Sequence, residues 1–251
     1  MVHIVGAGCG APDLITLRGK RFLEEADVIV YAGSLVNREL LQFAKPDCAI
    51  YDSAKMTLEE ILAVVCAAER AGKTTVRLHT GDPSLYGAIG EQMWEFDRRG
   101  IDYDITPGVS AFSGAAAALK TEYTLPDVSQ TVIISRAAGN TPVPQAESLR
   151  SLAAHRATMV LFLSAGLLEQ VTEELIAGGY PPETPAAIVY KASWDDEKVC
   201  RCTVATLAET AKQNGITKTA LITVGGFLTS EFTRSHLYDP AFSTEFREAK
   251  A

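Results

Sequence analysis

Apolar and polar residues alternate along the first half of the chain in a pattern that predicts five strands and the helices between them. Short β-branched runs predict strands, and stretches with apolar residues three or four positions apart predict helices. The predicted strands are VHIVG (2–6), DVIVY (27–31), CAIYD (48–52), TTVRLHT (74–80) and IDYDIT (101–106). The predicted helices cover residues 14–26, 38–44, 58–72, 86–100 and 109–120. Strands that alternate with helices in this way predict a mostly parallel sheet with helices on both faces.

The alternation stops in EYTLPDVS (122–129), which predicts a linker, and then resumes in the second half. The predicted strands there are 131–135, 158–164, 185–193, 199–204 and 219–225, with helices at 147–155, at 167–179 and up to residue 214. The short strand VCRCTV stands directly before a helix, which favours a mixed, partly antiparallel sheet. The sequence therefore predicts two α/β domains, at 1–121 and 131–251, joined by a linker at 122–130. Ligands of such folds bind beyond the carboxyl ends of the strands and between the domains, so we expect a cofactor cleft there.

Composition and charge limit the possible partners. The 251 residues include 47% hydrophobic and 22% charged side chains, as expected of a globular protein that needs no disulfides or metals to bury a core. The formal net charge of −8 argues against a nucleic-acid partner, although a local basic cluster still allows an anionic small molecule. The five cysteines include no C-x-x-C pair and no Cys/His zinc spacing, so we expect no metal and a reducing compartment. No apolar run approaches ~18 residues and no signal-like segment stands at the start, which predicts a cytosolic protein without membrane contact.

The first glycine-rich turn, GAGCGA (6–11), formally fits the dinucleotide pattern G-x-G-x-x-[G/A] after a strand. Pro12 offers no N–H to a pyrophosphate, and Asp13 as an N-cap would place the helix start near Leu14, outside the turn. No carboxylate follows the second strand to bind ribose hydroxyls. The turn therefore argues against an NAD(P) site, and a tight strand-to-helix turn without a ligand remains an alternative.

The second glycine-rich turn, TGDPSLYG (80–87), follows the fourth strand at its carboxyl end. Gly81 permits close backbone approach to a ligand, Asp82 suits ribose hydroxyls or a ligand amine, and Pro83 would start the next helix. The alternative is that the Asp-Pro pair only caps a helix. A third turn, TPGVSAFSGAAAAL (106–119), also leaves the end of a strand and has small residues that admit a flat ligand.

Together these three turns resemble the tetrapyrrole methylase family of S-adenosylmethionine-dependent enzymes, in VGAGCGAPDLITLRG, TGDPSLYG and TPGVSAFSGAAA. Further segments resemble the branch that methylates C11 of precorrin-4 or cobalt-precorrin-4 in cobalamin biosynthesis. They are YAGSLV (31–36), DSAKMTLEEI (52–61), SRAAGNTPVP (135–144), FLSAGL (162–167), IAGGYPPETPAAIVYKASW (176–194), KTALITVG (218–225) and SHLYDPAFSTEFR (235–247). The resemblance covers nearly the whole chain. It implies two α/β domains with S-adenosylmethionine in the cleft between them, and a homodimer.

The family pattern implies twelve cofactor contacts. They are Thr80, Gly81, Asp82, Leu85, Ser110, Ala111, Phe162, Leu163, Tyr190, Lys191, Thr219 and Ala220. Two departures stand out. Cys9 replaces the proline that is usual in the family's first turn. The Asp/Lys acid–base pair proposed for uroporphyrinogen-type relatives is not matched, because Ala32 stands near the first position and Lys55 only lies close to the second. We therefore assign no catalytic acid or base.

Methyl transfer to an enamine-like ring carbon needs positioning and exclusion of water more than a strong base. A polycarboxylated tetrapyrrole also needs cationic partners. The basic candidates are Arg18, Lys20, Arg38, Lys55, Lys120, Arg136 and Lys191, of which Arg136 and Lys55 are favoured, with solvated surface charges as the alternative. Further substrate candidates are Gly8 and Cys9 in the first turn and Tyr31 and Tyr86 beside the motif loops. His79 is predicted as a half-buried structural histidine, and Trp94 and Phe96 as core residues.

Three other functions stay open from the sequence. One is a methyltransferase of the same superfamily that acts on RNA or a modified protein residue. The second is a binding module that retains S-adenosylmethionine but has lost turnover, as Cys9 and the missing acid–base pair allow. An NAD(P) oxidoreductase is the third.

Overall fold

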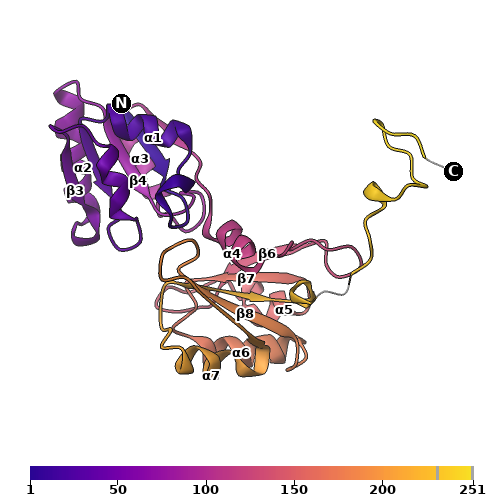
Figure 1. Ribbon diagram of the computed structural model, residues 1–251. Coiled ribbons are helices and arrows are strands. Elements are labelled where there is room, and N and C mark those ends of the chain that lie inside the picture. Colours follow the sequence, from indigo (N-terminus) through magenta and orange to yellow (C-terminus); the bar gives the residue numbers. More distant parts are fainter. Residues whose placement is uncertain (230–231, 250–251) are drawn as a thin grey trace. The chain divides into compact units, whose positions relative to one another are not determined.

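The computed structural model describes residues 1–229 and 232–249, which form two compact units (Figure 1). The first unit consists of Met1–Ala115 together with Lys191–Glu197, and the second of Ala116–Tyr190 together with Lys198–Ala251. Each unit contains one five-stranded sheet. Two α/β domains are thus confirmed, the first with a parallel sheet and the second with a mixed one.

The sheet of the first unit is parallel throughout and has the strand order β3-β2-β4-β1-β5. Its strands are β1 (Val2–Gly6), β2 (Val28–Tyr31), β3 (Ala49–Asp52), β4 (Thr75–His79) and β5 (Tyr103–Thr106). Parallel strands need crossover connections, and these are helical here. Because β4, β1 and β5 are neighbours, the three glycine-rich turns that follow them begin at the same edge of the sheet.

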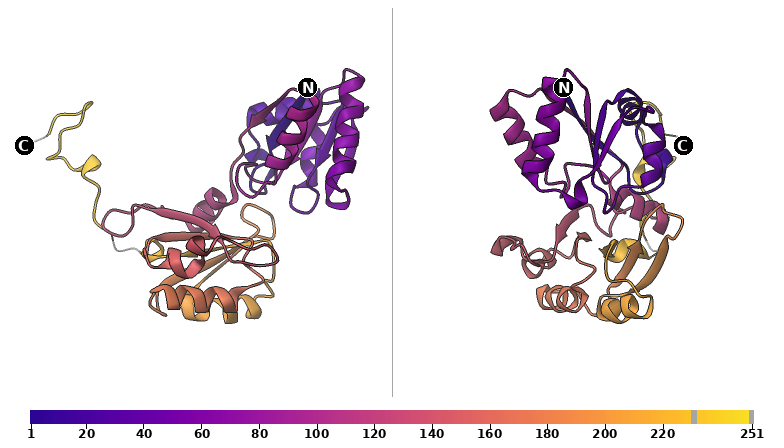
Figure 2. Two further views of the ribbon diagram at one scale, coloured as in Figure 1. Left: turned by 180° about the vertical axis from the view of Figure 1, so that it is seen from behind. Right: turned by 90° about the vertical axis from the view of Figure 1, so that its left-hand side faces the viewer.

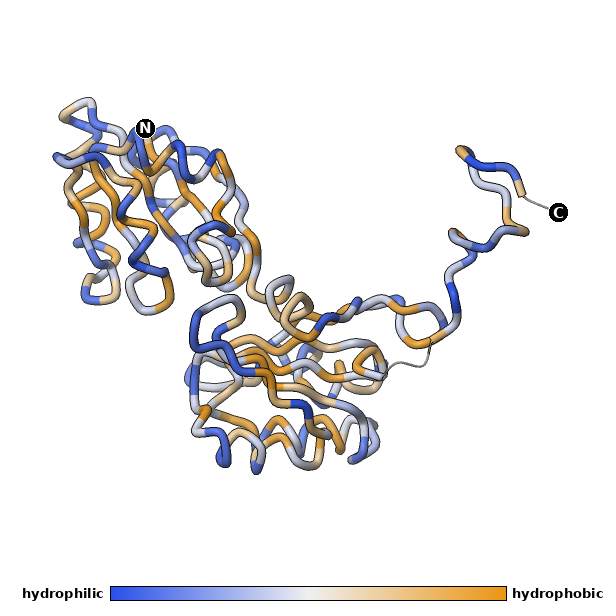
Figure 3. Tube along the Cα trace, in the orientation of Figure 1, coloured by the Kyte–Doolittle hydropathy of each residue, from blue (hydrophilic) through white to orange (hydrophobic). Residues whose placement is uncertain are grey.

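Helices cover both faces of this sheet, as the right-hand view of Figure 2 shows. Helices α2 (Leu58–Arg70) and α3 (Gly90–Arg99) pack on one face, where Val65 and Phe96 are fully buried. Helix α1 (Leu17–Glu25) packs on the other face through Phe22 and Leu23. Apolar stretches in Figure 3 run along the strands, whereas many of the connections are polar. This two-faced burial explains why β2 (VIVY), inside the sheet, is apolar and buried at every position.

The start of α1 differs from the prediction. The helix begins at Leu17, and its N-cap is Thr16, whose Oγ1 accepts a hydrogen bond from the N–H of Gly19 at 3.0 Å. Asp13 makes no side-chain cap, because it lies inside a short 3₁₀ turn, η1 (Pro12–Leu14). The helix therefore begins farther from the first glycine-rich turn than the sequence predicts.

Two other helix predictions are also corrected. Helix α3 begins at Gly90, so Pro83 does not start it; Tyr86 and Ala88 have φ of 57° and 50°, which an α-helix does not allow. The predicted helix at 38–44 is a 3₁₀ helix, η2 (Arg38–Phe43), with Asn37 as its N-cap. The predictions for α2 and for α4 (Ala111–Leu119) are confirmed within two residues at each end.

The second unit has the strand order β6-β7-β10-β8-β9. Its strands are β6 (Val132–Arg136), β7 (Thr158–Phe162), β8 (Pro185–Tyr190), β9 (Lys198–Thr203) and β10 (Ala220–Val224). Only β6 and β7 pair in parallel; β10 runs antiparallel to β7 and β8, and β9 antiparallel to β8. Helices α5 (Leu149–Ala153), α6 (Leu168–Gly178) and α7 (Leu207–Gln213) contribute to a single core cluster with this sheet.

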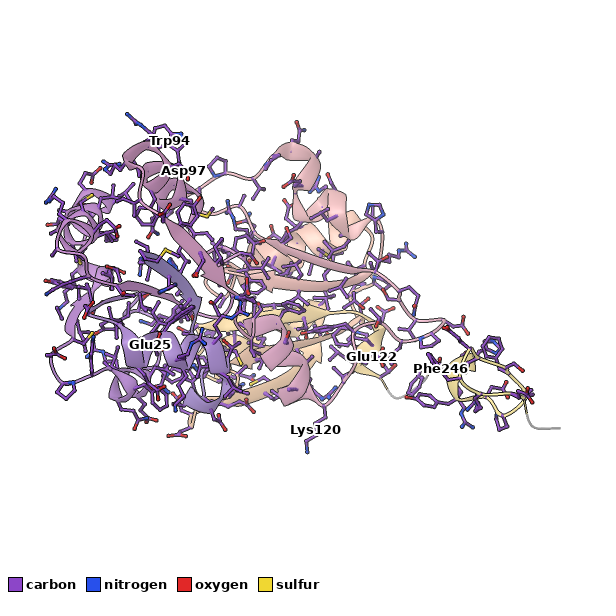
Figure 4. The ribbon with its side chains drawn as sticks, turned by 90° about the horizontal axis from the view of Figure 1, so that it is seen from above. Glu25, Trp94, Asp97, Lys120, Glu122 and Phe246 are labelled. Carbon is purple, nitrogen blue, oxygen red and sulfur yellow. The ribbon has the colours of Figure 1, made fainter. Side chains whose placement is uncertain are left out.

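The C-terminal residues 232–249 are organised by one guanidinium group. Nη2 of Arg247 lies 3.0, 2.7 and 3.2 Å from the carbonyl oxygens of Leu237, Asp239 and Phe242. The ring of Phe246 is 92% exposed and is labelled in Figure 4. This segment, which contains the motif SHLYDPAFSTEFR, is therefore held by backbone carbonyls around an arginine.

Candidate functional site

Three glycine-rich turns interlock at the carboxyl edge of the first unit's sheet. Gly8 and Gly81 form an antiparallel bridge, in which the N–H of Gly8 lies 3.2 Å from the Gly81 oxygen and the N–H of Gly81 lies 2.8 Å from the Gly8 oxygen. A Cβ on Gly6 would lie 2.6 Å from Cα of Gly108, and a Cβ on Gly108 would lie 2.1 Å from the Gly81 oxygen. Backbone therefore packs directly on backbone, which only glycine permits.

Asp82 joins the second and third turns. Its Oδ2 accepts a hydrogen bond from the N–H of Gly108 at 2.9 Å, and its Oδ1 accepts from the N–H and the hydroxyl of Ser84. Burial alone would raise the pKa of Asp82, but the hydrogen bonds from Ser84 and Gly108 outweigh burial and lower the pKa below its ordinary value of 3.8. Asp82 is therefore an anion at neutral pH, held between two turns.

The predicted cofactor residues of the first unit lie around these turns. A Cβ on Gly81, whose φ is 60°, would point to within 3.6 Å of the Ala111 nitrogen and 3.7 Å of Cα of Ser110. Ser110 is buried, Ala111 is the first residue of α4, and the Thr80 hydroxyl donates to the Leu35 oxygen at 3.4 Å. The structure thus brings together the second and third turns, which follow β4 and β5.

Lys191 also belongs to the first unit, although it follows directly after β8. Its ammonium lies 2.6 Å from Oδ2 of Asp196 and 5.5 Å from the centre of the Trp194 ring. The same short segment contacts the first glycine-rich turn, where Cys9 and Gly10 are buried. Lys191 is therefore placed with Gly8 and Cys9 in one unit.

The predicted cofactor residues of the second unit lie at one end of its sheet. Phe162 ends β7, Tyr190 ends β8 and Ala220 begins β10. The register pairs Ala220 with Tyr190, and Ile222 with Leu161, so the start of β10 lies beside the ends of β7 and β8. Residues far apart in the sequence thus meet at one edge.

Two residues that adjoin this edge have left-handed backbone. Leu163 has a φ of 52° and Thr219 a φ of 57°, and the side chain of Leu163 is 64% exposed. Non-glycine residues keep such a conformation only where the surrounding structure holds it, and they are frequent at functional sites.

Arg136 ends β6 and is paired in register with Phe162, which places it at the same edge. Its guanidinium donates to the carbonyl oxygens of Ala137, Thr141 and Pro142 at 3.2, 3.0 and 2.9 Å. Among the described residues, no carboxylate forms an ion pair with this guanidinium. Its positive charge is therefore solvated by carbonyl dipoles and is not cancelled by an anion.

The other substrate candidates have different environments. Tyr31 ends β2 and is only 6% exposed, packed in the core on the α1 side. Tyr86 is 43% exposed and has a left-handed φ of 57°. Lys55 is the last residue of an exposed 3₁₀ turn, η3 (Ser53–Lys55).

Two buried basic side chains of β4, Arg77 and His79, lie directly before the second turn in the sequence. The Arg77 guanidinium donates to Oε1 of Gln92 at 2.9 Å and to the Val30 oxygen at 3.0 Å, and burial lowers its pKa to about 10. Burial, together with the Arg77 charge, lowers the pKa of His79 to about 3. His79 is therefore a neutral imidazole, and it is fully buried, not half-buried as predicted.

Sequence reasoning missed three residues at the first turn. The Asn37 amide donates to the Gly10 oxygen at 3.1 Å, and Ser193 and Trp194 also contact this turn. Asn37 directly follows the motif YAGSLV, and Ser193 and Trp194 end the motif IAGGYPPETPAAIVYKASW (176–194), but neither motif indicates a contact with the first turn. The prediction that Trp94 lies in the core is wrong, because its ring is 57% exposed on the outer side of α3 (Figure 4). Phe96 is fully buried, as predicted.

Residues 1–229 and 232–249 contain neither a membrane-spanning helix nor a group of side chains suited to a metal ion. No helix there is both long and apolar enough to cross a membrane. Within the same ranges, no three His, Cys, Asp or Glu side chains are grouped so that they could bind a metal ion.

Comparison with known proteins gives matches along the whole chain. A family model described as Tetrapyrrole (Corrin/Porphyrin) Methylases matches residues 1–208. Over 249 residues the chain is 55% identical to the cobalt-precorrin-4 C(11)-methyltransferase of Methanocaldococcus jannaschii, with 99% of this chain and 96% of the relative covered. It is 48% identical over 242 residues to the precorrin-4 C(11)-methyltransferase of Mycobacterium tuberculosis, with 96% of each covered.

Solved structures agree with this comparison. The X-ray structure of a cobalamin biosynthetic enzyme, cobalt precorrin-4 methyltransferase, matches with a TM-score of 0.89 and 47% identity, covering 91% of this chain and 95% of that one. The uroporphyrin-III C-methyltransferase of Thermus thermophilus complexed with S-adenosyl homocysteine matches with a TM-score of 0.75 and 28% identity, covering 90% and 92%.

Proposed function

The chain belongs to the family of tetrapyrrole (corrin/porphyrin) methylases, and from this premise we propose that it methylates C11 of precorrin-4 or cobalt-precorrin-4 in cobalamin biosynthesis. The observation that carries the proposal is the high identity, over nearly the full length, to relatives named for that reaction. These relatives carry both the cobalt and the metal-free substrate in their names, so the proposal includes both substrates.

The proposed methyl donor is S-adenosylmethionine, which supplies a methyl group on a positively charged sulfonium. The first unit fits such a ligand. Gly81 differs from the tightly packed glycines of these turns, because a Cβ there would make only ordinary contacts, at 3.6 Å from the Ala111 nitrogen and 3.7 Å from Cα of Ser110. Asp82 adds a negative charge at the same turn, which favours a cationic ligand.

In this proposal the second unit contributes Phe162, Leu163, Tyr190, Thr219 and Ala220, which gather at one edge of its sheet. The first unit contributes Thr80, Gly81, Asp82, Leu85, Ser110, Ala111 and Lys191. By position in the chain we propose an N-terminal domain at 1–121 and a C-terminal domain at 131–251, which the linker 122–130 joins; Lys191 falls in the C-terminal domain by position but packs in the first unit.

The work of these residues is to position the reactants. In-line methyl transfer gains most from a fixed geometry and from exclusion of water. The backbones of Gly6, Gly81 and Gly108 pack on one another, which supports a fixed geometry of the turns. His79 cannot serve as the base at neutral pH from its buried position, and we assign no other residue to that role.

The proposed substrate is a polycarboxylated tetrapyrrole, for which the candidates are Arg136, Lys55, Tyr86, Tyr31 and the turn at Gly8 and Cys9. Arg136 is favoured because its guanidinium donates to three carbonyl oxygens and, within the described ranges, forms no ion pair with a carboxylate. We also propose a homodimer in the cytoplasm. The five free cysteines agree with a reducing compartment, and sedimentation analysis of the purified protein would test the dimer.

The direct test is to incubate the purified protein with methyl-labelled S-adenosylmethionine and with precorrin-4 or cobalt-precorrin-4. We expect label in the macrocycle at C11 with at least one of the two substrates. Binding of S-adenosylhomocysteine without transfer to either substrate would favour a binding module without turnover. Tighter binding of NADH than of S-adenosylhomocysteine would contradict the proposal altogether.

A further inference from the structure

The segment Lys191–Glu197 joins β8 to β9 of the second unit but belongs to the first unit. It lies on the glycine-rich turn that follows β1. Two polar contacts of the Ser193 side chain hold the segment on that turn.

The hydroxyl of Ser193 bonds to the first turn twice. It accepts a hydrogen bond from the N–H of Ala11 at 3.0 Å and lies 3.4 Å from Sγ of Cys9. A serine hydroxyl has one proton and two lone pairs. With one lone pair used by Ala11, the proton remains available for the sulfur of Cys9, or the second lone pair for its S–H. The two residues therefore form a complementary polar pair across the contact.

Close packing around this pair leaves no spare volume. A Cβ on Gly10 would lie 2.3 Å from Cδ1 of Trp194 and 2.7 Å from the Ala192 oxygen. A Cβ on Gly114 would lie 2.7 Å from Sγ of Cys9 and 3.3 Å from Cβ of Ala192. The segment thus packs closely on Gly10 and Gly114, and Gly114 also contacts the Cys9 thiol.

The segment is also braced internally in a conformation that needs support. Lys191 and Ser193 have φ of 47° and 65°, which cost free energy in residues other than glycine. The N–H of Ser193 donates to Glu197 at 2.6 Å, and Lys191 pairs with Asp196. A strained segment of this kind keeps its shape only while its anchor holds.

We propose that Ser193, paired with Cys9, is a positioning residue that fixes the segment Lys191–Glu197 against the first glycine-rich turn. Its effect is on Lys191 and the turn around Cys9, at the edge where the cofactor is proposed to bind, so this inference rests on the proposed function. Cys9, the departure from the family's usual proline, thereby has a specific partner in this chain.

The test uses the full chain carrying Trp94→Phe, which leaves Trp194 as the sole tryptophan. Trp94 is exposed on α3, so its replacement does not touch the turn. Ser193→Ala keeps the backbone preference of a non-glycine residue and removes only the hydroxyl. We expect the Kd for S-adenosylhomocysteine to rise roughly tenfold, because the partly buried N–H of Ala11 loses its acceptor and the segment loses its anchor. We also expect the KM for S-adenosylmethionine to rise with kcat nearly unchanged, and acrylamide to quench Trp194 more strongly.

A matched control deletes an equivalent hydroxyl elsewhere. Ser148 caps α5 in the second unit and accepts from the N–H of Ser151 at 3.2 Å. Ser148→Ala should lower thermal stability while Kd and Trp194 quenching stay as in the parent. Cys9→Ser, which keeps a hydrogen-bonding group, should bind within about twofold of the parent, and Cys9→Ala should bind more weakly.

Unchanged Kd and unchanged quenching in Ser193→Ala would overturn the inference. An equal rise of the Kd for S-adenosylhomocysteine in Ser193→Ala and Ser148→Ala would also overturn the inference, because it would indicate a general loss of stability. If the parent protein binds no S-adenosylhomocysteine, the proposed function fails. The quenching comparison then decides by itself whether Ser193 holds the segment.

Discussion

Asp82 has a structural role that the sequence alone does not separate from its proposed role in ligand binding. The sequence suggests a carboxylate for a ligand, and the structure shows the same carboxylate accepting hydrogen bonds from Gly108 and Ser84. A carboxylate that accepts backbone N–H groups is stabilised as an anion, which is why its pKa is lowered. Its charge and its position are therefore fixed by the same contacts.

Asp82→Asn is expected to lower the free energy of unfolding by on the order of 1 kcal/mol at neutral pH, because an amide nitrogen cannot accept from a backbone N–H. The folded-state pKa lies below the unfolded value, so the carboxylate's contribution is present above about pH 4 and is lost as pH falls below it. The stability difference between the two proteins, measured by urea unfolding from neutral to acidic pH, should therefore shrink in acid.

His79 supplies the background for this measurement. Its pKa is lowered to about 3, so the unfolded chain takes up a proton at higher pH than the folded one, and stability falls below about pH 6.5 in both proteins. That loss cancels in the difference between wild type and Asp82→Asn. A difference that stays constant down to pH 3 would mean that the Asp82 charge does not stabilise the turns.

The three turns act as one structural element, because Gly6, Gly81 and Gly108 pack on one another and Gly8 is bridged to Gly81. Gly108→Ala should lower the free energy of unfolding by several kcal/mol, since its Cβ would lie 2.1 Å from the backbone oxygen of Gly81 and neither side can yield cheaply. Chemical denaturation of the purified variant measures this.

Gly90→Ala is the matched control for that variant. A Cβ on Gly90 would meet nothing within 4 Å, and the residue begins α3, where alanine is the better helix former. We expect it to be neutral or to stabilise by up to ~1 kcal/mol. If Gly108→Ala and Gly90→Ala lowered the free energy of unfolding equally, the interlocked arrangement of the turns would be contradicted.

Periodicity predicts the elements of this fold well where a buried face dictates them. The ten strands lie where the β-branched runs predict, and α2 and α4 end within two residues of their predictions. Prediction failed where backbone conformation is set by distant contacts: the left-handed Tyr86 and Ala88 break a stretch that looks helical, and Thr16 caps α1 in place of Asp13.

The candidate site could be predicted only in part, for the same physical reason. Glycine-rich turns at strand ends can be recognised in the sequence, and they are predicted to lie together because parallel strands bring their carboxyl ends to one edge. The return of residues 191–197 to the first unit leaves no periodic signal, so the contact of Ser193 and Trp194 with the first turn could not be predicted, although both residues lie in the motif at 176–194. The prediction for Trp94 failed because a large aromatic side chain can lie on a helix surface beneath a cation without entering the core. Here Cζ of Arg98 lies 4.6 Å from the centre of the Trp94 ring.

The net charge of −8 bears on how the whole molecule would bind the polycarboxylated tetrapyrrole that is proposed as its substrate. At long range the net charge repels such a ligand, and at short range a basic group attracts it. Salt separates the two effects, because screening weakens whichever one dominates. The Debye length falls from about 10 Å at 0.1 M salt to about 3 Å at 1 M.

If Arg136 and its neighbours control binding, raising KCl from about 0.05 M to about 0.5 M should increase the KM for the tetrapyrrole several-fold, because local attraction is screened. The KM for S-adenosylmethionine and kcat should change little. Steady-state kinetics with sucrose in place of KCl controls for viscosity and solvent effects.

Charge variants decide whether Arg136 is the group responsible. Arg136→Gln should remove much of the salt dependence, and Arg136→Lys should retain it, because lysine keeps the charge while losing the planar contacts with Thr141 and Pro142. Lys212→Gln, on the exposed side of α7, should behave like the wild type. A KM that falls with salt would mean that the net charge dominates, and the substrate carboxylates would then have to be held by uncharged donors.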